Sequence, residues 1–239
     1  MKFEYYGNSD IGPNRKINQD NFGEATTKWG SLFVVSDGFG HEKGGLFASR
    51  YTVETLVEVY SHTEPKDVEE FFTNTYKQIN KYIYFTKVSK YGRAMMGCTS
   101  VALAIYDNMV HVAHIGDSRA YLFRNGEFIQ LTKDHSYIQN LIDEGGVTLE
   151  EAKLHPKRHV LSRALGSKKQ TIPDHRSVEI QPDDKFVLCS DGVWGFIEKE
   201  SFKKMIGENE PEKAVNSVIK NIKRNNGLDN ITLQVIHFE

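Results

Sequence analysis

Several aspartates of this chain lie where an apolar run meets a turn. Asp37 follows the run "FVVS" and Asp191 follows "FVLCS", and each is followed directly by glycine. Further carboxylates stand in comparable places, namely Asp20 in "GPNRKINQD", Asp117 after an apolar run and Asp229 just before the last one. Carboxylates gathered at strand ends, without histidine or cysteine pairs at ligand spacing, favour Mg²⁺ or Mn²⁺ over Zn²⁺. The pattern predicts a divalent-cation site.

An Asp-Gly pair is weak evidence by itself, because hairpin turns favour the same dipeptide for its positive φ. Here "SDG" occurs twice, at residues 36–38 and 190–192, and each copy ends an apolar run. A strand that ends in this way presents its carboxylate at the rim of a sheet, and Gly38 lets its own carbonyl come close to a bound ion. Together with the other aspartates, the repeat favours the cation site over two unrelated turns.

The elements that would position these residues can be predicted from periodicity. Runs rich in β-branched and aromatic residues indicate strands at Phe3–Tyr6, Leu32–Ser36, Thr99–Tyr106, Val110–Ile115, Ala120–Phe123, Phe128–Leu131, Arg176–Ile180, Phe186–Ser190 and Ile231–Phe238. Helical spacing of apolar residues indicates helices at Gly45–Tyr60, Val68–Ile83 and Pro211–Asn225. Strands with short turns between them, and helices that come in series, favour an α+β fold with helices over antiparallel sheets.

Composition sets the class of protein. The 239 residues, of 27.3 kDa, suit one domain spanning 1–239, and the net charge of -2 gives no sign of nucleic-acid or membrane binding. The start "MKFEYYGNSD" lacks an apolar signal region and no apolar run is long enough to span a bilayer, so we expect a cytoplasmic protein. Cys98 and Cys189 lie in apolar runs, which suits buried thiols in a reducing compartment.

The motifs, taken in order, resemble those of the bacterial metal-dependent type 2C serine/threonine protein phosphatases, the PPM family. The resemblance covers nearly the whole chain, and the pieces are "RKINQD", "VVSDGFG", "MGCTSVAL", "HIGDSRAYLFRNG", "LTKDHS", "EAKLHPKRHVLSRALG", "VLCSDGVW" and "DNIT". It implies a four-layer α-β-β-α sandwich, in which two antiparallel β-sheets are flanked by pairs of helices. It also implies a two-metal cleft at one end of the sandwich.

The resemblance assigns roles position by position. Asp37 matches the carboxylate that bridges both metal ions, and Gly38 matches a backbone-carbonyl ligand of one of them. Asp191 and Asp229 match ligands of the second ion.

Outside that pair of ions, the resemblance implies that Asp20 holds a metal-bound water and that Asp117 serves a third, weaker site. Arg15 matches the arginine that binds phosphate, a role its planar, two-pronged guanidinium suits.

The implied activity is hydrolysis of phosphoserine and phosphothreonine in proteins, with Mn²⁺ or Mg²⁺ as cofactor. Two such ions can lower the pKa of a water and balance charge on the phosphoryl group. The expected partners are phosphorylated proteins, including a cognate serine/threonine kinase and its targets or phosphorylated anti-sigma antagonists. A monomer with no nucleic-acid or membrane partner is expected.

Two rival functions follow from the residues near Asp37. A pseudophosphatase, which only binds a partner, would fit Phe39–Glu42, where this chain departs from the family pattern. Many bacterial relatives have Met in place of Phe39, followed by Gly-Gly-His. Eukaryotic relatives usually carry histidine in place of Phe39. His41 could protonate the leaving group or be an uninvolved loop residue. Nucleotide binding is suggested by "GFGHEKG", but Lys43 occupies the place of the third glycine. The complete set of carboxylates favours catalysis.

The segment at about 137–155 matches the flap beside the active site of bacterial relatives. It carries two short helical patterns around Glu144–Gly146, and "TLEE" has the form of a capping box. We expect the flap to be the most mobile ordered part of the chain. His135 and His155 match residues that anchor loops.

Overall fold

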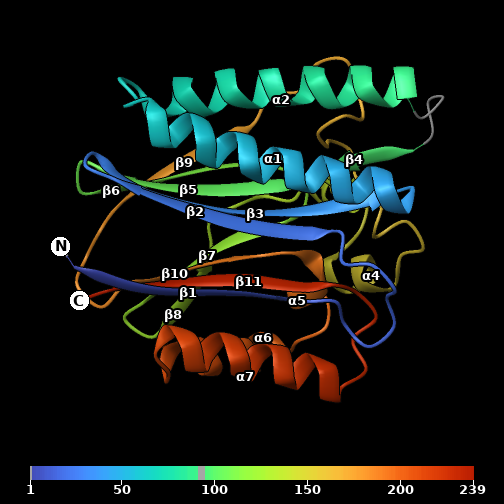
Figure 1. Cartoon of the computed structure of the whole chain (residues 1–239). Coiled ribbons are helices and arrows are strands. Elements are labelled where there is room, and N and C mark those ends of the chain that lie inside the picture. The colour runs from blue at the N-terminus through green and yellow to red at the C-terminus, as the bar shows by residue number, and fades with distance from the viewer. Residues whose placement is uncertain (1, 91–94) are drawn as a thin grey trace.

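The computed structural model describes residues 2–90 and 95–239, and two antiparallel sheets form its centre (Figure 1). In the first sheet the order is β1 (Phe3–Asp10), β11 (Ile231–Phe238), β10 (Lys185–Cys189), β7 (Arg119–Arg124) and β8 (Glu127–Gln130). In the second it is β2 (Asp20–Thr27), β3 (Gly30–Gly40), β5 (Ser100–Tyr106), β6 (Met109–Ile115) and β9 (Asp174–Glu179), with β4 (Met96–Cys98) added to the end of β3.

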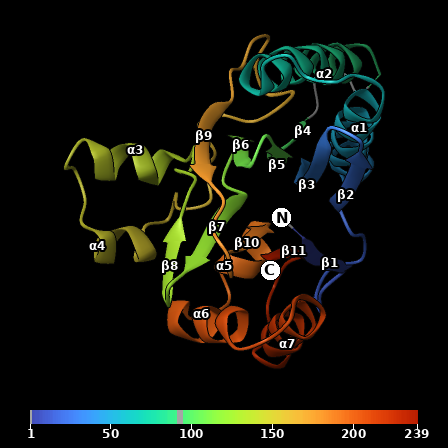
Figure 2. The ribbon, with the colours of Figure 1, turned by 90° about the vertical axis from the view of Figure 1, so that its left-hand side faces the viewer.

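Helices cover the outer face of each sheet. The long helices α1 (Glu42–His62) and α2 (Val68–Lys90) lie over the second sheet, and α6 (Lys199–Gly207) and α7 (Pro211–Arg224) lie over the first (Figure 1). Between the two layers of strands the chain has no helix, so the order of layers is α-β-β-α in the described part of the chain. Figure 2 shows α3 (Tyr137–Asp143) and α4 (Leu149–Leu154) standing apart at one side. The predicted four-layer sandwich is confirmed.

Apolar runs along the central strands supply three cores. In β3, Leu32 and Val34 pack toward α1 and α2, whereas Phe33 and Val35 pack between the two sheets. In β10, Val187 faces α6 and α7 while its neighbours face the other sheet. Because successive side chains of a strand point to opposite faces, a strand buried on both faces needs an unbroken apolar run. This explains why "FVVS" and "FVLCS" lead straight to the rim of the sandwich.

The helices predicted from periodicity are confirmed, and α1 and α2 extend beyond the predicted ends. Strand β2 was missed because "DNFGEATT" has no apolar run; its neighbour β3, in full register from Asp20–Asp37 to Thr27–Gly30, holds it in place. The short helix α5 (Asp191–Trp194) and α6 were also missed. No helix among the described residues is both long and apolar enough to cross a bilayer.

Candidate functional site

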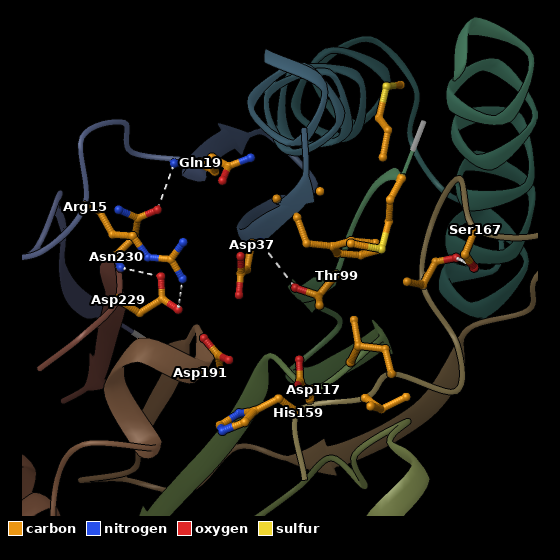
Figure 3. A pocket seen from close by; sticks show the side chains of 18 of the residues that line it. Arg15, Gln19, Asp37, Thr99, Asp117, His159, Ser167, Asp191, Asp229 and Asn230 are labelled. Carbon is orange, nitrogen blue, oxygen red and sulfur yellow. Dashed lines mark hydrogen bonds and ion pairs between the residues drawn. The ribbon is translucent and has the colours of Figure 1, made fainter. Parts of the chain in front are cut away.

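A cavity of about 660 Å³ opens at one end of the sandwich, where strands of both sheets end. Its lining includes most of the residues singled out from the sequence: Arg15, Asp37, Gly38, Asp117, Asp191 and Asp229. Figure 3 shows the carboxylates of Asp37, Asp117 and Asp191 directed toward one common space, with Asp229 and Arg15 at its side. The structure thus brings together carboxylates that are far apart in the sequence.

Asp37 lies where β3 changes partners. Up to Val35 the strand pairs with β5, and from Gly38 it pairs with β4. At the change, the Thr99 backbone N–H donates to the Asp37 carbonyl (2.8 Å), and the Asp37 N–H donates to Thr99 Oγ1 (3.2 Å). Both backbone groups of Asp37 are therefore fixed by one residue, and its side chain is free to point into the cavity.

Asp20 does not line the cavity but is buried behind it. It pairs with Asp37 in the β2–β3 register, and its Oδ2 accepts a hydrogen bond from Ser190 Oγ (2.7 Å). Because Ser190 follows β10 of the other sheet, Asp20 joins the two sheets immediately below the cavity floor. This burial is consistent with a supporting position next to Asp37 rather than with an open ligand site.

The backbone of the glycines in the two "SDG" copies shows whether these dipeptides form hairpin turns. Neither Gly38 nor Gly192 has a positive φ: the first lies within β3 and the second within α5. Both are required by close backbone approach, because a Cβ on Gly38 would collide with the Gly45 carbonyl and one on Gly192 with the Asn230 carbonyl. The interpretation of these dipeptides as hairpin turns is therefore wrong.

Asn230 organises the loop that carries Arg15, a role that sequence analysis missed. It is buried, its Oδ1 accepts from the Gln19 N–H (2.9 Å), and its Nδ2 donates to the carbonyls of Ile11 (2.8 Å) and Ile17 (3.1 Å). On this loop, the half-exposed Arg15 donates from Nη2 to Asp229 Oδ2 at 2.6 Å. The signal was present in "DNIT", where an asparagine directly follows a candidate ligand.

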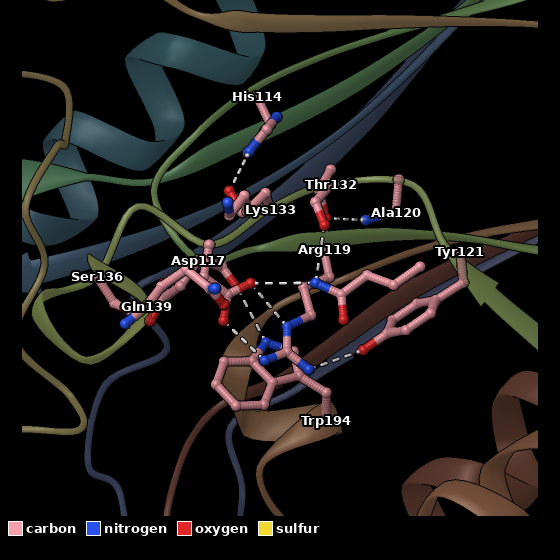
Figure 4. A network of polar contacts seen from close by, with 12 residues as sticks. His114, Asp117, Arg119, Ala120, Tyr121, Thr132, Lys133, Ser136, Gln139 and Trp194 are labelled. Carbon is pink, nitrogen blue, oxygen red and sulfur yellow. Dashed lines mark hydrogen bonds and ion pairs between the residues drawn. The ribbon is translucent and has the colours of Figure 1, made fainter. Parts of the chain in front are cut away.

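A second network, also missed, supports Asp117 (Figure 4). Trp194 Nε1 donates to the Asp117 carbonyl (2.9 Å), and the Arg119 guanidinium lies 3.5 Å from the centre of the Trp194 ring. Arg119 in turn makes two hydrogen bonds to the buried Asp134, at 2.9 and 2.7 Å. Since Trp194 ends α5, which begins at Asp191, this network fixes two candidate ligands at once.

The electrostatics of the cluster show what it lacks. Burial, followed by the charges of Asp20 and Asp191, raises the pKa of Asp37 well above its usual range. Burial and then Asp191 do the same for the pKa of Asp117, and burial raises the pKa of Asp20 to about 7. Carboxyl groups that resist ionisation because they are buried and lie close to one another need cationic charge among them to be ionised. Oxygen-rich and without thiols, this set fits hard divalent cations.

A pH dependence of stability follows. Asp20 has a higher pKa in the folded chain than its unfolded value of 3.8, so its contribution is present below pH 3.8 and is lost as the pH rises through about 7. The buried histidines whose pKa is lowered, such as His114 and His135, are neutral above pH 7 and add no slope there. In chelator, we expect the free energy of unfolding of the wild type to fall relative to that of Asp20→Asn by about 1 kcal/mol per pH unit between pH 4.5 and 6.5, and the difference to level off above pH 7.5; the histidines are common to both proteins and cancel in this difference. Denaturant titrations measure it, and a constant difference in chelator would contradict the expectation; excess Mn²⁺ should remove the fall.

The histidines divide between the cleft and its surroundings. His159, which sequence analysis did not single out, lines the cavity beside Asp191 and Asp117 (Figure 3), whereas His41 does not line it and its backbone N–H donates to the Met95 carbonyl. His135 anchors its loop as predicted, because its Nδ1 accepts from the Gly116 N–H at 3.1 Å.

A second group of possible ligands lies outside the cleft, where donor atoms of His114, His135 and Asp174 all lie within 4.8 Å of one another. Arg163 occupies both carboxylate oxygens of Asp174, at 2.6 and 3.1 Å. A cation there would have to displace this guanidinium, so the group is better described as an ion-pair network.

Comparison with known proteins agrees with the geometry. Residues 9–221 match the sequence profile of the family described as Protein phosphatase 2C. "Protein phosphatase PhpP" of Streptococcus pneumoniae is 31% identical over 233 residues, which cover 95% of this chain and 94% of that protein. A serine/threonine phosphatase of S. agalactiae superposes with a TM-score of 0.94 at 29% identity, covering 100% of both chains. The catalytic domain of the serine/threonine phosphatase PstP, solved with 2 manganese ions, gives 0.88 at 28% identity and covers 99% of both.

Proposed function

This chain belongs to the protein phosphatase 2C family and is a metal-dependent serine/threonine phosphoprotein phosphatase, and we propose that Arg15 and the aspartates of the cleft carry its activity. The observation that supports the proposal is the convergence of carboxylates from both sheets on one cavity beside an arginine. Phosphate monoesters resist water because the dianion repels a nucleophile, so the site must supply positive charge.

The residues have separate tasks in this proposal. Asp37 lies between the others and would hold two cations, with the Gly38 carbonyl beside one of them and Asp191 and Asp229 around the second. Asp117 would serve a third, weaker site. Divalent cations bound there supply charge on the phosphoryl oxygens and make a water more acidic.

Asp20 is proposed to hold a water of this site from behind Asp37. Hydrogen bonds from the side chains of Ser190 and Thr232 hold its carboxylate in position next to Asp37.

Arg15 is proposed to bind the phosphate. Its ion pair with Asp229 leaves the rest of the guanidinium facing the cavity, where two further donors could contact phosphate oxygens. We expect Arg15→Ala to lower kcat/KM for p-nitrophenyl phosphate about ten- to a hundredfold, mainly through KM, because a charge-assisted hydrogen bond contributes about 1.5–3 kcal/mol. Steady-state kinetics with Arg15→Lys alongside would measure it. An unchanged KM would exclude Arg15 from phosphate binding.

The finer assignments rest on the sequence. We propose Mn²⁺ or Mg²⁺ as the cofactor, a cognate serine/threonine kinase and its targets as partners, a monomeric state and a cytoplasmic location. The two buried, unpaired cysteines, Cys98 and Cys189, suit a reducing compartment. The single-domain assignment of 1–239 and the mobility of the flap at about 137–155 stay predictions.

The pseudophosphatase alternative is not favoured. A protein that had lost catalysis would be expected to lack a ligand carboxylate, and this chain keeps them all: Asp37, Asp117, Asp191 and Asp229 line the cavity, and Asp20 pairs with Asp37 in the β2–β3 register. The unusual Phe39–Glu42 segment leaves this arrangement intact.

The test is hydrolysis of p-nitrophenyl phosphate and of a phosphothreonine peptide by the purified protein, with Mn²⁺, with Mg²⁺ and with chelator. We expect turnover with at least one metal and none with chelator. A folded protein that binds Mn²⁺ but turns over neither substrate would overturn the enzyme assignment in favour of a binding module.

A further inference from the structure

A second hollow, of about 450 Å³, lies along α2 next to the cleft. One wall is a single stripe of the helix, because Thr73, Lys77, Lys81 and Phe85 recur every four residues. The opposite wall is the segment 169–172 that precedes β9, and Figure 2 shows this part of the chain passing beside α2. We call this hollow the α2 groove.

The α2 groove is preformed by hydrogen bonds beneath it. Asn80 is buried, its Oδ1 accepts from the Gly166 N–H (2.8 Å), and its Nδ2 donates to the carbonyls of Lys168 and Lys169 (3.2 Å each). Lys87 Nζ donates to the Gly166 carbonyl at the end nearer the cleft. A groove whose two walls are tied together in this way can bind a segment without first being ordered.

The charge of the α2 groove has one sign. Among its described lining residues are Lys77, Lys81 and Lys169, and none is acidic. The chain as a whole carries 30 basic and 32 acidic residues, so this local excess is not a reflection of composition. The positive charge along α2 ends at Thr73, because the preceding turn of the helix carries the acidic residues Glu69 and Glu70. An acidic ligand would therefore be favoured within the groove and repelled beyond it.

The α2 groove also exposes apolar side chains. Phe85 is 49% exposed and Ile172 is 67% exposed, on opposite walls. Apolar contact between charged side chains is what a peptide segment requires.

The α2 groove lies beside the catalytic cleft. Lys87 and Ser167 line the cleft, while Phe85 and Lys169, each two residues away along the same two segments, line the groove. From Thr73 to Phe85 the helix rises about 18 Å at about 1.5 Å per residue. An extended segment of about five or six residues would fill this length.

Taking the proposed phosphatase function as its basis, we propose that the α2 groove binds an acidic, partly apolar segment of the phosphoprotein substrate, a few residues from the phosphorylated serine or threonine. The groove then selects among phosphoproteins, while the cleft performs hydrolysis on any phosphate monoester that reaches it.

The experiment compares phosphothreonine peptides that differ in one stretch of five residues, either glutamates around a leucine or glutamines around the same leucine. The stretch is placed three residues before or three residues after the phosphothreonine. At low salt we expect kcat/KM for one acidic peptide to exceed that for its neutral partner at least about threefold, since several exposed charge pairs, each weak by itself, act together and are little screened. The variant Lys77→Ala/Lys81→Ala/Lys169→Ala should bring the ratio to about one.

The matched control is Lys204→Ala/Lys213→Ala/Lys220→Ala, which removes the same charge from α6 and α7 on the far layer. It should keep the preference for the acidic peptide. Hydrolysis of p-nitrophenyl phosphate, which is too small to reach the α2 groove, reports whether the cleft is intact in each variant. Equal turnover of acidic and neutral peptides by the wild type, with p-nitrophenyl phosphate still hydrolysed, overturns the groove proposal and leaves the phosphatase function standing.

A direct binding measurement covers the case in which nothing is hydrolysed. A fluorescein-labelled, non-phosphorylated acidic peptide should bind the wild type and the α6–α7 control, by anisotropy, and lose binding in the groove variant. No binding to the wild type overturns the proposal, and so does binding of a single-stranded oligonucleotide in preference to the acidic peptide.

Discussion

Replacing Asp37 by asparagine should lower kcat for p-nitrophenyl phosphate about a hundred- to ten-thousandfold. The cations that this carboxylate would hold contribute several kcal/mol of charge stabilisation to the transition state, and each 1.4 kcal/mol is a tenfold change in rate. Asparagine keeps the size of the side chain but supplies one neutral oxygen. Calorimetric titration should show a parallel loss of Mn²⁺ affinity.

The same variant should be at least as stable as the wild type in chelator. Burial and neighbouring carboxylates already disfavour the ionised form of Asp37, as its raised pKa shows, so a neutral side chain relieves repulsion. Mn²⁺ should then raise the melting temperature of the wild type but not of the variant.

Asp107→Asn is the matched control. It makes the same chemical change on an exposed turn with φ of 48°, where asparagine is well tolerated, at the end of β5 away from Thr99. It should leave turnover and metal binding unaltered. Full activity in Asp37→Asn would remove Asp37 from the metal site.

Arg119→Met should destabilise the fold by about 3–5 kcal/mol, because it removes one partner of a largely buried ion pair. Asp134 would remain buried at 8% side-chain exposure with its bidentate partner gone. Burial alone would lower the pKa of Arg119, and the hydrogen bonds and charge of Asp134 raise it instead, which shows how strongly the pair is coupled. Urea unfolding measures the loss.

Two companion variants separate this cause from general damage. Arg119→Met/Asp134→Leu removes both charges and should recover most of the stability, because no unpaired charge stays buried. Arg50→Met breaks an exposed pair between Arg50 and Glu54 on α1 and should change little. If the single and double variants were equally unstable, the ion pair would not be the cause.

Loss of Arg119 should also weaken metal binding in the cleft. Its guanidinium packs on Trp194, whose Nε1 holds the Asp117 carbonyl. Weaker Mn²⁺ binding at the lowest-affinity site, with the other sites kept, is the expected signature in the folded fraction.

The sequence predicted the parts of the fold that apolar runs determine. Both faces of β3 and β10 are buried, so their residues are apolar without interruption and their ends mark Asp37 and Asp191. β2 was missed because it is held by its partner rather than by its own apolar residues. Local pattern cannot reveal an element whose stability is supplied from elsewhere in the chain.

For the site, the sequence identified the carboxylates but not what holds them. Asn230 and Trp194 act through backbone groups of loops far away in the chain, and such contacts leave no periodic trace. The α2 groove could not be predicted for the same reason. In the sequence its lysines are typical of a solvated helix face, and only the fold places the segment 169–172 opposite them. What the sequence could not show is which distant segments the fold brings into contact; the residue types alone do not reveal it.

Strand β11 is an interior strand of its sheet, between β1 and β10, and pairs with β1 from Phe3–Phe238 to Asp10–Ile231. During translation, therefore, the first sheet has a gap between β1 and β10 until β11 has left the ribosome. Asp229 and Asn230 arrive with that strand, so the loop carrying Arg15 is fixed only then. If the site is as proposed, we expect a nascent chain to have no phosphatase activity before its synthesis has passed β11, and contacts of such long sequence separation make slow, late folding the expected behaviour.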